Sequence, residues 1–236
     1  MHPKKVAIIQ SNYIPWKGYF DVINSVDEFI LFDDVQYTRR DWRNRNLIKT
    51  AHGLHWLTIP VEVKDKYDIP INEVTVADPH WAKKHWTTLS QAYAKAPFFR
   101  EYRPVFENLY LTMRETHLSR INSLFIRAVN ELLRIPTRIT WSTDYELTSG
   151  KNEKLASLCS QAGATEYLSG PAAKGYLDEA YFAAQGITVT WMDYSGYPEY
   201  GQLHPPFAHG VSVLDLLFNE GPRATHFMKS FRQSVA

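Results

Sequence analysis

Residues 6–34 read VAIIQSNYIPWKGYFDVINSVDEFILFDD, and within them two apolar runs flank one turn and one short helix. Val6–Gln10 and Phe29–Phe32 have the length and apolar character of strands that are covered on both faces of a parallel sheet. The second run leads directly into two carboxylates, Asp33 and Asp34. Ligands of open parallel sheets bind beyond the carboxyl ends of the strands. This stretch therefore predicts an α/β fold with a site at that edge of the sheet.

The rest of the chain alternates between strand and helix patterns, without repeats or an obvious linker. Apolar residues at helical spacing fill residues 81–135, which we expect to form a helical insertion. Strands and helices alternate again from residue 137, as in a βαβ protein. The sequence therefore predicts one α/β domain over residues 1–236, with a mostly parallel open sheet. The remaining strands are expected at 47–49, 55–60, 73–76, 137–141, 166–170 and 188–191, and the helices at 20–25, 81–95, 104–112, 118–133, 152–161, 176–185 and 211–218.

The composition is that of a globular protein, with 44% hydrophobic and 22% charged residues. A formal net charge of +1 gives no reason to expect non-specific binding of nucleic acid. The single cysteine, Cys159, excludes an intramolecular disulfide and a zinc site built from thiolates, and we expect it to be a buried, inert thiol. No run approaches the roughly 20 apolar residues that a membrane span needs. We therefore expect a cytoplasmic protein.

The turn after the first strand carries groups suited to an anion. Gly18 allows the backbone to approach a ligand, and the helix that follows offers unpaired N–H groups at its N-terminus. Lys17 could reach a phosphate or a carboxylate from this position, and Gln10 and Asn12 converge there. The alternative is an ordinary strand-to-helix turn with a lysine that faces solvent.

Asp33 and Asp34 are compatible with three functions: a magnesium site, a hydrogen bond to a ribose or sugar hydroxyl, and a general base. Acidic pairs at strand ends also begin turns or cap helices. The pair would equally be a partner for Arg39, Arg40 or Arg43, which weakens the case for a metal. The histidines show no convincing zinc spacing, so we assign no metal.

A basic and aromatic segment, DWRNRN, occupies residues 41–46. Arginine forks bind phosphate or carboxylate through two hydrogen bonds, and an indole offers a stacking face. If this segment is extended, Trp42, Asn44 and Asn46 lie on one face. Arg43 and Arg45 then lie on the other, so only one of the two sets would line a site. The alternatives are a solvated basic loop and an RNA-binding segment, and the balanced net charge disfavours RNA.

A second strand-to-helix turn, YLSGPAAKGY at residues 167–176, also has ligand-binding chemistry. Ser169 and the amide of Gly170 are placed like a clamp for a phosphate or a carbonyl group, with Lys174 in reach. The spacing of a P-loop is absent. An ordinary Gly-Pro turn is the alternative.

Over nearly the whole chain these motifs resemble those of the WbqC-like family. The resemblance implies modification of sugars in the cytoplasm, for O-antigen, a part of lipopolysaccharide, or for other surface polysaccharides. It also adds Tyr13, Tyr19, Gln36 and Tyr37 to the candidate binding residues. The matching segments are QSNYIP (10–15), KGYF (17–20), DDVQY (33–37), NRN (44–46), LTIP (57–60), YAKAPFF (93–99), YLSG (167–170) and SVLDLLFN (212–219).

Residues 13–23, YIPWKGYFDVI, also resemble the first motif of nucleotidyltransferase-type folds, which has two histidines on the first strand-to-helix turn. Lys17 and Tyr19 stand at those two positions. Lys17 could stabilise charge on a phosphoryl group, and Tyr19 much less so. The resemblance implies a Rossmann-like fold and nucleotide binding, with Ser169-Gly170 as the second nucleotide-binding turn. Because Lys17 and Tyr19 replace both histidines of the motif, the case for nucleotidyl transfer itself is weaker.

We therefore expect a transferase that acts on a nucleotide-linked sugar, by N-acyl or N-aminoacyl transfer to an amino sugar. Lys17, Arg43 or Arg45, and the Ser169-Gly170 turn would hold phosphates. Asp33 or Asp34 would act as base or accept a sugar hydroxyl, while Asn44 and Asn46 orient the substrate. No cofactor is required, and coenzyme A or a carrier protein would deliver an acyl thioester.

Two alternatives remain open: a nucleotidyltransferase or adenylate-forming enzyme, and a non-catalytic sugar-binding scaffold. The sequence does not identify the sugar, the donor, a need for magnesium or the oligomeric state.

Overall fold

A sheet of parallel strands forms the centre of the computed structural model, which describes residues 3–231. Its strand order is β5-β2-β1-β6-β7, and every neighbouring pair is parallel. Numbered by their sequence within this sheet, the strands follow the doubly wound order 3-2-1-4-5, in which the winding reverses between β1 and β6. The expected mostly parallel α/β fold is confirmed. The strands are β1 (Lys5–Ile9), β2 (Glu28–Leu31), β5 (Arg138–Trp141), β6 (Glu166–Ser169) and β7 (Thr188–Trp191).

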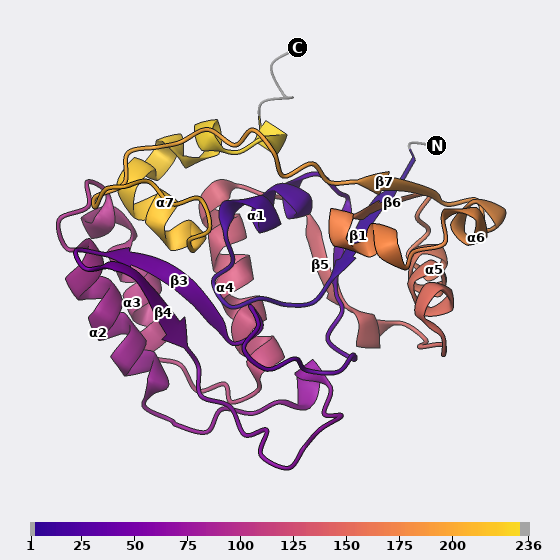
Figure 1. The fold of residues 1–236 in the computed structure, drawn as a ribbon, viewed down its shortest axis with the longest axis horizontal. Coiled ribbons are helices and arrows are strands. Elements are labelled where there is room, and N and C mark those ends of the chain that lie inside the picture. The colour runs from indigo at the N-terminus through magenta and orange to yellow at the C-terminus, as the bar shows by residue number, and fades with distance from the viewer. Residues whose placement is uncertain (1–2, 232–236) are drawn as a thin grey trace.

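Helices cover both faces of this sheet, because successive side chains of a strand point to opposite faces. Ala7 of β1 packs in one hydrophobic core with helices α1 (Lys17–Asn24) and α4 (Leu118–Leu133). Its neighbours Val6 and Ile8 pack in a second core with α5 (Lys151–Gln161) and α6 (Glu179–Ala184). Cys159 of α5 lies in this second core, where burial raises the pKa of its thiol to about 12, as expected of an inert cysteine. Figure 1 shows α5 and α6 at one end of the molecule, opposite α2, α3 and α7.

The connection from β2 to β5 is long and contains most of the irregular architecture. It begins with an antiparallel hairpin of β3 (Arg45–Thr50) and β4 (Gly53–Thr58), continues through a short 3₁₀ helix, η1 (Ile71–Glu73), and then forms α2 (Trp81–Tyr93), α3 (Phe99–Leu111) and α4. The expected strand at 73–76 is wrong, since only isolated bridges at Thr75 and Val76 follow η1.

The expected start of the helix at Pro104 is also wrong, because α3 begins at Phe99 and contains this proline. Pro104 has no N–H for the carbonyl of Arg100, which lies on the exposed surface. Water can therefore satisfy that carbonyl, and the helix tolerates the proline.

An irregular segment, residues 192–212, leads from β7 to α7 (Val213–Glu220) and the 3₁₀ helix η4 (Gly221–Phe227). Buried Asp215 of α7 holds part of it, because its carboxylate accepts hydrogen bonds from the hydroxyls of Tyr93 (2.8 Å) and Tyr200 (2.8 Å). Short 3₁₀ helices also follow β5 (η2, Ser142–Asp144) and β6 (η3, Pro171–Gly175). None of the helices in residues 3–231 has the length and apolar character to span a membrane.

A buried polar network fixes the first strand-to-helix turn to the helical insertion. Tyr13 is completely buried, and its hydroxyl lies 2.9 Å from Nδ1 of His85 and 2.6 Å from the hydroxyl of Tyr110. Nε2 of His85 faces the carbonyl of Thr58 at 3.2 Å and must donate to it. Nδ1 is then an acceptor, so Tyr13 donates to His85 and Tyr110 donates to Tyr13. Burial lowers the pKa of His85 to about 4, which keeps the ring neutral.

This network predicts a loss of stability in mild acid. The pKa of His85 is lower in the folded chain (about 4) than its ordinary value of 6.5, so the folded state binds fewer protons. The stabilisation is complete above pH 6.5 and is lost as the pH falls towards 4, by up to about 3 kcal/mol. This loss of stability is measured by urea unfolding of the wild type and of His85→Gln at pH 7, 6, 5 and 4. The stability difference between the two proteins should shrink over this range, whereas exposed His52→Gln should follow the wild type at every pH.

Candidate functional site

The guanidinium of Arg43 lies at the carboxyl end of β1, at the centre of the predicted site. It comes from the loop before β3 and donates to both amide side chains that follow β1, to Gln10 Oε1 at 3.0 Å and to Asn12 Oδ1. The carboxylate of Asp41 lies 3.5 Å from Nη2. The Arg43 side chain is 13% exposed, and its Nε has no partner among the described residues. This arrangement presents one largely desolvated cation beside the point at which the sheet reverses its winding.

Asp33 is buried directly behind this group. One of its oxygens accepts the backbone N–H of Ser11 (2.8 Å), and the other accepts the hydroxyl of Ser119 from α4. Burial raises the pKa of Asp33, while these two hydrogen bonds and the positive charge of Arg43 oppose that rise. Asn122 of α4 completes the link, since it donates to the Ser11 hydroxyl (3.0 Å) and to the Arg43 carbonyl (2.9 Å).

Asp34 points to the other face of the sheet. It accepts hydrogen bonds from the hydroxyl of Ser142, after β5, and from Nζ of Lys154 on α5 at 2.7 Å. Its side chain is 7% exposed, compared with 22% for Lys154, so the pair lies near the surface of this edge. The two consecutive carboxylates therefore lie in different environments. The described residues contain no group of three or more histidine, cysteine or acidic side chains that could hold a metal ion.

The first turn uses its own lysine and glycine for packing. Lys17 is buried, and its ammonium donates to the carbonyl of Pro198 (2.9 Å) and lies 5.2 Å and 5.0 Å from the ring centres of Tyr197 and Tyr200. A methyl group at Gly18 would overlap the indole of Trp16. Tyr19 is also buried, and its hydroxyl donates to the Gln10 carbonyl at 3.0 Å. Of this turn, Gln10 and Asn12 contact Arg43, whereas Lys17 contacts residues 197–200.

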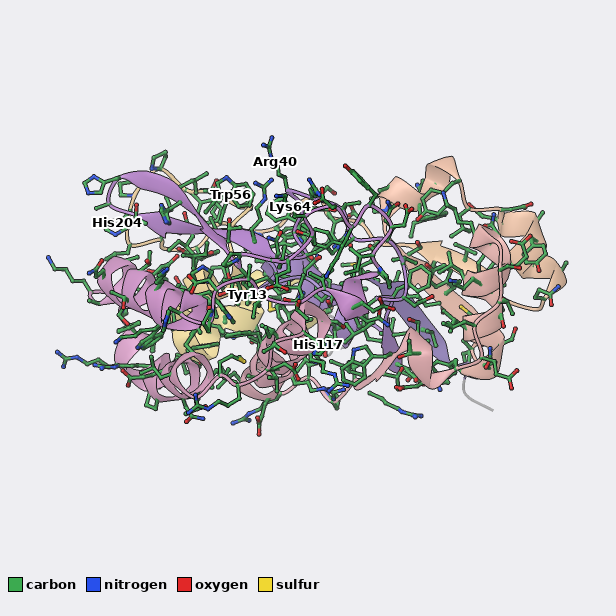
Figure 2. All side chains as sticks on the ribbon, turned by 90° about the horizontal axis from the view of Figure 1, so that it is seen from below. Tyr13, Arg40, Trp56, Lys64, His117 and His204 are labelled. Carbon is green, nitrogen blue, oxygen red and sulfur yellow. The ribbon has the colours of Figure 1, made fainter. Side chains whose placement is uncertain are left out.

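A hollow of about 280 Å³ adjoins Asn12 and has aromatic walls. Trp42 is 42% exposed there, and its ring lies 5.5 Å from that of Trp56, which is 40% exposed. The guanidinium of Arg45 lies 4.2 Å from the centre of the Trp56 ring. Figure 2 shows Trp56 and Arg40 on the same side of the molecule, with Tyr13 in its interior. The lining residues are Asn12, Pro15, Trp16, Trp42, Asn46, His209 and Gly210.

Asn44 and Asn46 are buried and hold the surrounding backbone. Asn44 donates to the carbonyl of Ile59 (2.8 Å), and Asn46 donates to the carbonyls of Tyr13 and Ile14, both at 3.1 Å. Ile14 has φ = 38°, an uncommon conformation for a β-branched residue, and the bond from Asn46 stabilises it. Strict alternation predicted that only one of two sets, either Trp42, Asn44 and Asn46 or Arg43 and Arg45, would line the site. Members of both sets surround it, because β3 begins only at Arg45 and the chain before it turns.

The remaining predicted residues are spread along the same edge. Ser169 ends β6, the neighbour of β1 on the far side of the reversal point, and Gly170 follows it. Lys174 is exposed, with its ammonium 5.4 Å from the ring centre of Trp191. Gln36 is exposed and donates to the Tyr67 carbonyl (2.7 Å), whereas Tyr37 is buried, which raises its pKa to about 12.

Four residues around the candidate carboxylates were not predicted from the sequence: Ser119 contacts Asp33, Ser142 and Lys154 contact Asp34, and Asn122 contacts Ser11 and Arg43. Ser119 and Asn122 are polar positions three residues apart on the largely apolar, buried side of α4, which also carries Ser123 and Asn130. That interruption of the apolar face was a usable signal, because a buried polar side chain needs a hydrogen-bond partner. Lys154 had no comparable signal in a helix that carries several polar residues.

The contact between Gly18 and Trp16 predicts that Gly18→Ala destabilises the protein by about 1–3 kcal/mol, because the indole must move to admit the methyl group. Urea unfolding measures the change. Gly175→Ala is the matched control, since a methyl group there meets no atom within 4 Å. Equal stability of the two variants would show that Trp16 is free to move away.

Comparison with known proteins agrees with the family resemblance of the sequence. The model of the "WbqC-like protein family" matches residues 10–227. A protein of Mycobacterium tuberculosis (strain ATCC 25618 / H37Rv), described as "Uncharacterized protein Rv1507c", is 51% identical over 230 residues, which cover 98% of this chain and 100% of that protein. No solved structure matches the chain. On the family match and this relative together, the chain belongs to the WbqC-like protein family.

Proposed function

We propose that the protein is a transferase that modifies a nucleotide-linked sugar for O-antigen or another surface polysaccharide, by N-acyl or N-aminoacyl transfer to an amino sugar. The observation that carries the proposal is the position of Arg43. Its guanidinium lies at the carboxyl end of β1, where the winding of the sheet reverses, and beside a hollow with aromatic walls. Doubly wound sheets bind nucleotides at this point of the fold.

Arg43 suits the diphosphate of such a substrate. Two of its acceptors, Gln10 and Asn12, are neutral amides, and the carboxylate of Asp41 is 3.5 Å away. A phosphate oxygen is a stronger acceptor than an amide oxygen, and a guanidinium binds phosphate through two hydrogen bonds. The Ser169-Gly170 turn of the neighbouring strand could donate to the same group from the opposite side of the crevice.

The hollow suits the sugar. A volume of about 280 Å³ is close to the lower end of the range for small-molecule sites. Trp16 and Trp42 offer apolar ring faces to the C–H groups of a sugar ring, and the amide of Asn12 offers a donor to its hydroxyls. The exposure of Trp42 and Trp56 is then explained by contact with a ligand.

The proposed chemistry needs one base. The amine of the sugar attacks the carbonyl carbon of the acyl donor, the new C–N bond replaces the C–S bond, and the sulfur leaves as a thiolate. The proton that the amine loses passes first to a carboxylate, for which Asp33 and Asp34 are the candidates, and then to the thiolate. Asp34 lies nearer the surface, paired with Lys154, whereas both oxygens of Asp33 accept hydrogen bonds inside the protein.

Nucleotidyl transfer is a second candidate, favoured by the strand order 3-2-1-4-5 and the nucleotide-binding position that this order creates. It differs from the first proposal in requiring magnesium and releasing pyrophosphate. A pyrophosphate-release assay with nucleoside triphosphates and sugar phosphates would separate the two.

Binding is tested first by thermal shift with nucleotide-linked amino sugars, free nucleotides, magnesium–ATP and acyl thioesters. A ligand at 100 times its Kd should add about 2.7 kcal/mol of stability. Arg43→Gln should weaken nucleotide-sugar binding about ten- to hundredfold, since hydrogen bonds to a charged group are lost. The control is Arg103→Gln, at an exposed position of α3, and this variant should bind like the wild type. Unchanged binding by Arg43→Gln would contradict the assignment of this site.

The base is tested with Asp33→Asn and Asp34→Asn in an acyl-transfer assay with the nucleotide sugar found by thermal shift. The variant that removes the base should lose about 10²–10⁴-fold in kcat, because an amide cannot accept the proton. Its affinity for the nucleotide sugar should stay within a few-fold of the wild type. Full activity of both variants would exclude a carboxylate base at this edge.

A further inference from the structure

A second and larger cavity, of about 630 Å³, lies along the first half of α4 and the end of β5. The hollow beside Arg43 shares none of its lining residues. In Figure 2 His117, which lines this cavity, and Trp56, which contacts Trp42 of the hollow, lie on opposite sides of Tyr13. Its volume falls within the range of small-molecule sites.

The acidic side chains of this cavity are already satisfied by the protein. Oε1 of Glu115 accepts the backbone N–H groups of Thr116 (2.8 Å) and His117 (2.9 Å), and the His117 ring lies 3.2 Å away. Asp144 accepts the backbone N–H of Trp141 at 2.9 Å. These carboxylates hold the local backbone, so their negative charge is partly compensated.

The basic side chains keep unused donors. Arg120 and Arg127 are seven residues apart on α4, which places them on the same side of the helix. Arg127 donates from Nε to the Ser123 hydroxyl (3.2 Å) and from Nη2 to the Ile139 carbonyl (2.9 Å), so part of its fork remains available. Among residues 3–231, the nearest acidic oxygen to Arg120 belongs to Glu115, at 3.9 Å, which is too far for a hydrogen bond.

From this surplus of donors we infer that the cavity binds an anionic group of the phosphate or carboxylate class. Two guanidinium groups on one helix side can share such an anion, because each offers a planar fork. Trp141 contributes an apolar wall, with the Arg127 guanidinium 5.3 Å from its ring centre. The occupant that fits is a small organic molecule with a phosphate and an apolar or ring-shaped part.

A chain of side-chain hydrogen bonds joins the cavity to the candidate site. The indole N–H of Trp141 donates to the Ser119 hydroxyl (3.3 Å), and Ser119 donates to Asp33. Asp33 in turn accepts the N–H of Ser11, between Gln10 and Asn12. An occupant of the cavity therefore lies on the other side of Asp33 from Arg43. If the proposed function holds, this occupant is the phosphate-bearing acyl donor, and that assignment alone rests on the proposed function.

The test follows the indole N–H signals of the 7 tryptophans by NMR, with Trp141 and Trp42 assigned through Trp→Phe variants. Inorganic pyrophosphate and coenzyme A are the probes. The Trp141 signal should shift saturably with at least one of them. Arg120→Gln should weaken that binding about tenfold or more, and Arg127→Gln should do the same. Arg103→Gln should not change it. Arg120 is exposed and outside the core, so its variant tests binding without risk to the fold.

A Trp141 signal that does not move with either probe would overturn the inference, as would equal affinity in the wild type and both α4 variants. Nucleotide sugars report separately on the candidate site through Trp42. A shift of the Trp42 signal without a shift of the Trp141 signal would leave the proposed function standing and show that the cavity has no part in it. Saturable movement of Trp141 without Trp42 would support the cavity and count against the proposed function.

Discussion

The carboxylate of Asp33 joins three parts of the chain that are far apart in sequence. It follows β2, accepts the N–H of Ser11 after β1, and accepts the hydroxyl of Ser119 on α4. A buried carboxylate is costly unless its oxygens are satisfied, so these bonds fix the geometry closely. The positions of Gln10, Asn12 and the Arg43 guanidinium follow from it, because the loop of Ser11 carries the two amides that hold the arginine.

The extended chain that continues from β2 places the two neighbouring carboxylates in different environments. Successive side chains point to opposite faces of a sheet, so Asp33 faces α4 and Asp34 faces α5. One carboxylate is enclosed by hydroxyl and backbone donors, and the other is paired with an ammonium near the surface. A single dipeptide thus connects the carboxyl edge of the sheet to both of its helical layers.

The alternation of short apolar strands with helices was enough to predict the parallel sheet and the edge at which polar residues gather. Local patterns could not predict partners supplied by segments far away in the sequence. Lys17 was predicted to bind a ligand from its position after a strand, and Tyr13 from the family resemblance. In the structure Tyr13 contacts His85 and Tyr110, and Lys17 contacts Pro198. Similarly, the strand expected at 73–76 forms only isolated bridges, from Thr75 to His117 and from Val76 to Val61, because strand formation depends on the neighbours that the fold supplies.

The turn after β1 depends on residues that are synthesised long after it. The ring faces of Tyr197 and Tyr200 surround the Lys17 ammonium, and Asp21 of α1 accepts the backbone N–H groups of Lys229 and Ser230, both at 2.9 Å. During synthesis on the ribosome these partners emerge about 200 residues after the turn itself. The N-terminal βαβ unit can form early, but a buried lysine without its aromatic cage has to wait. The turn after β1 therefore reaches its final geometry only after residue 230 has left the exit tunnel.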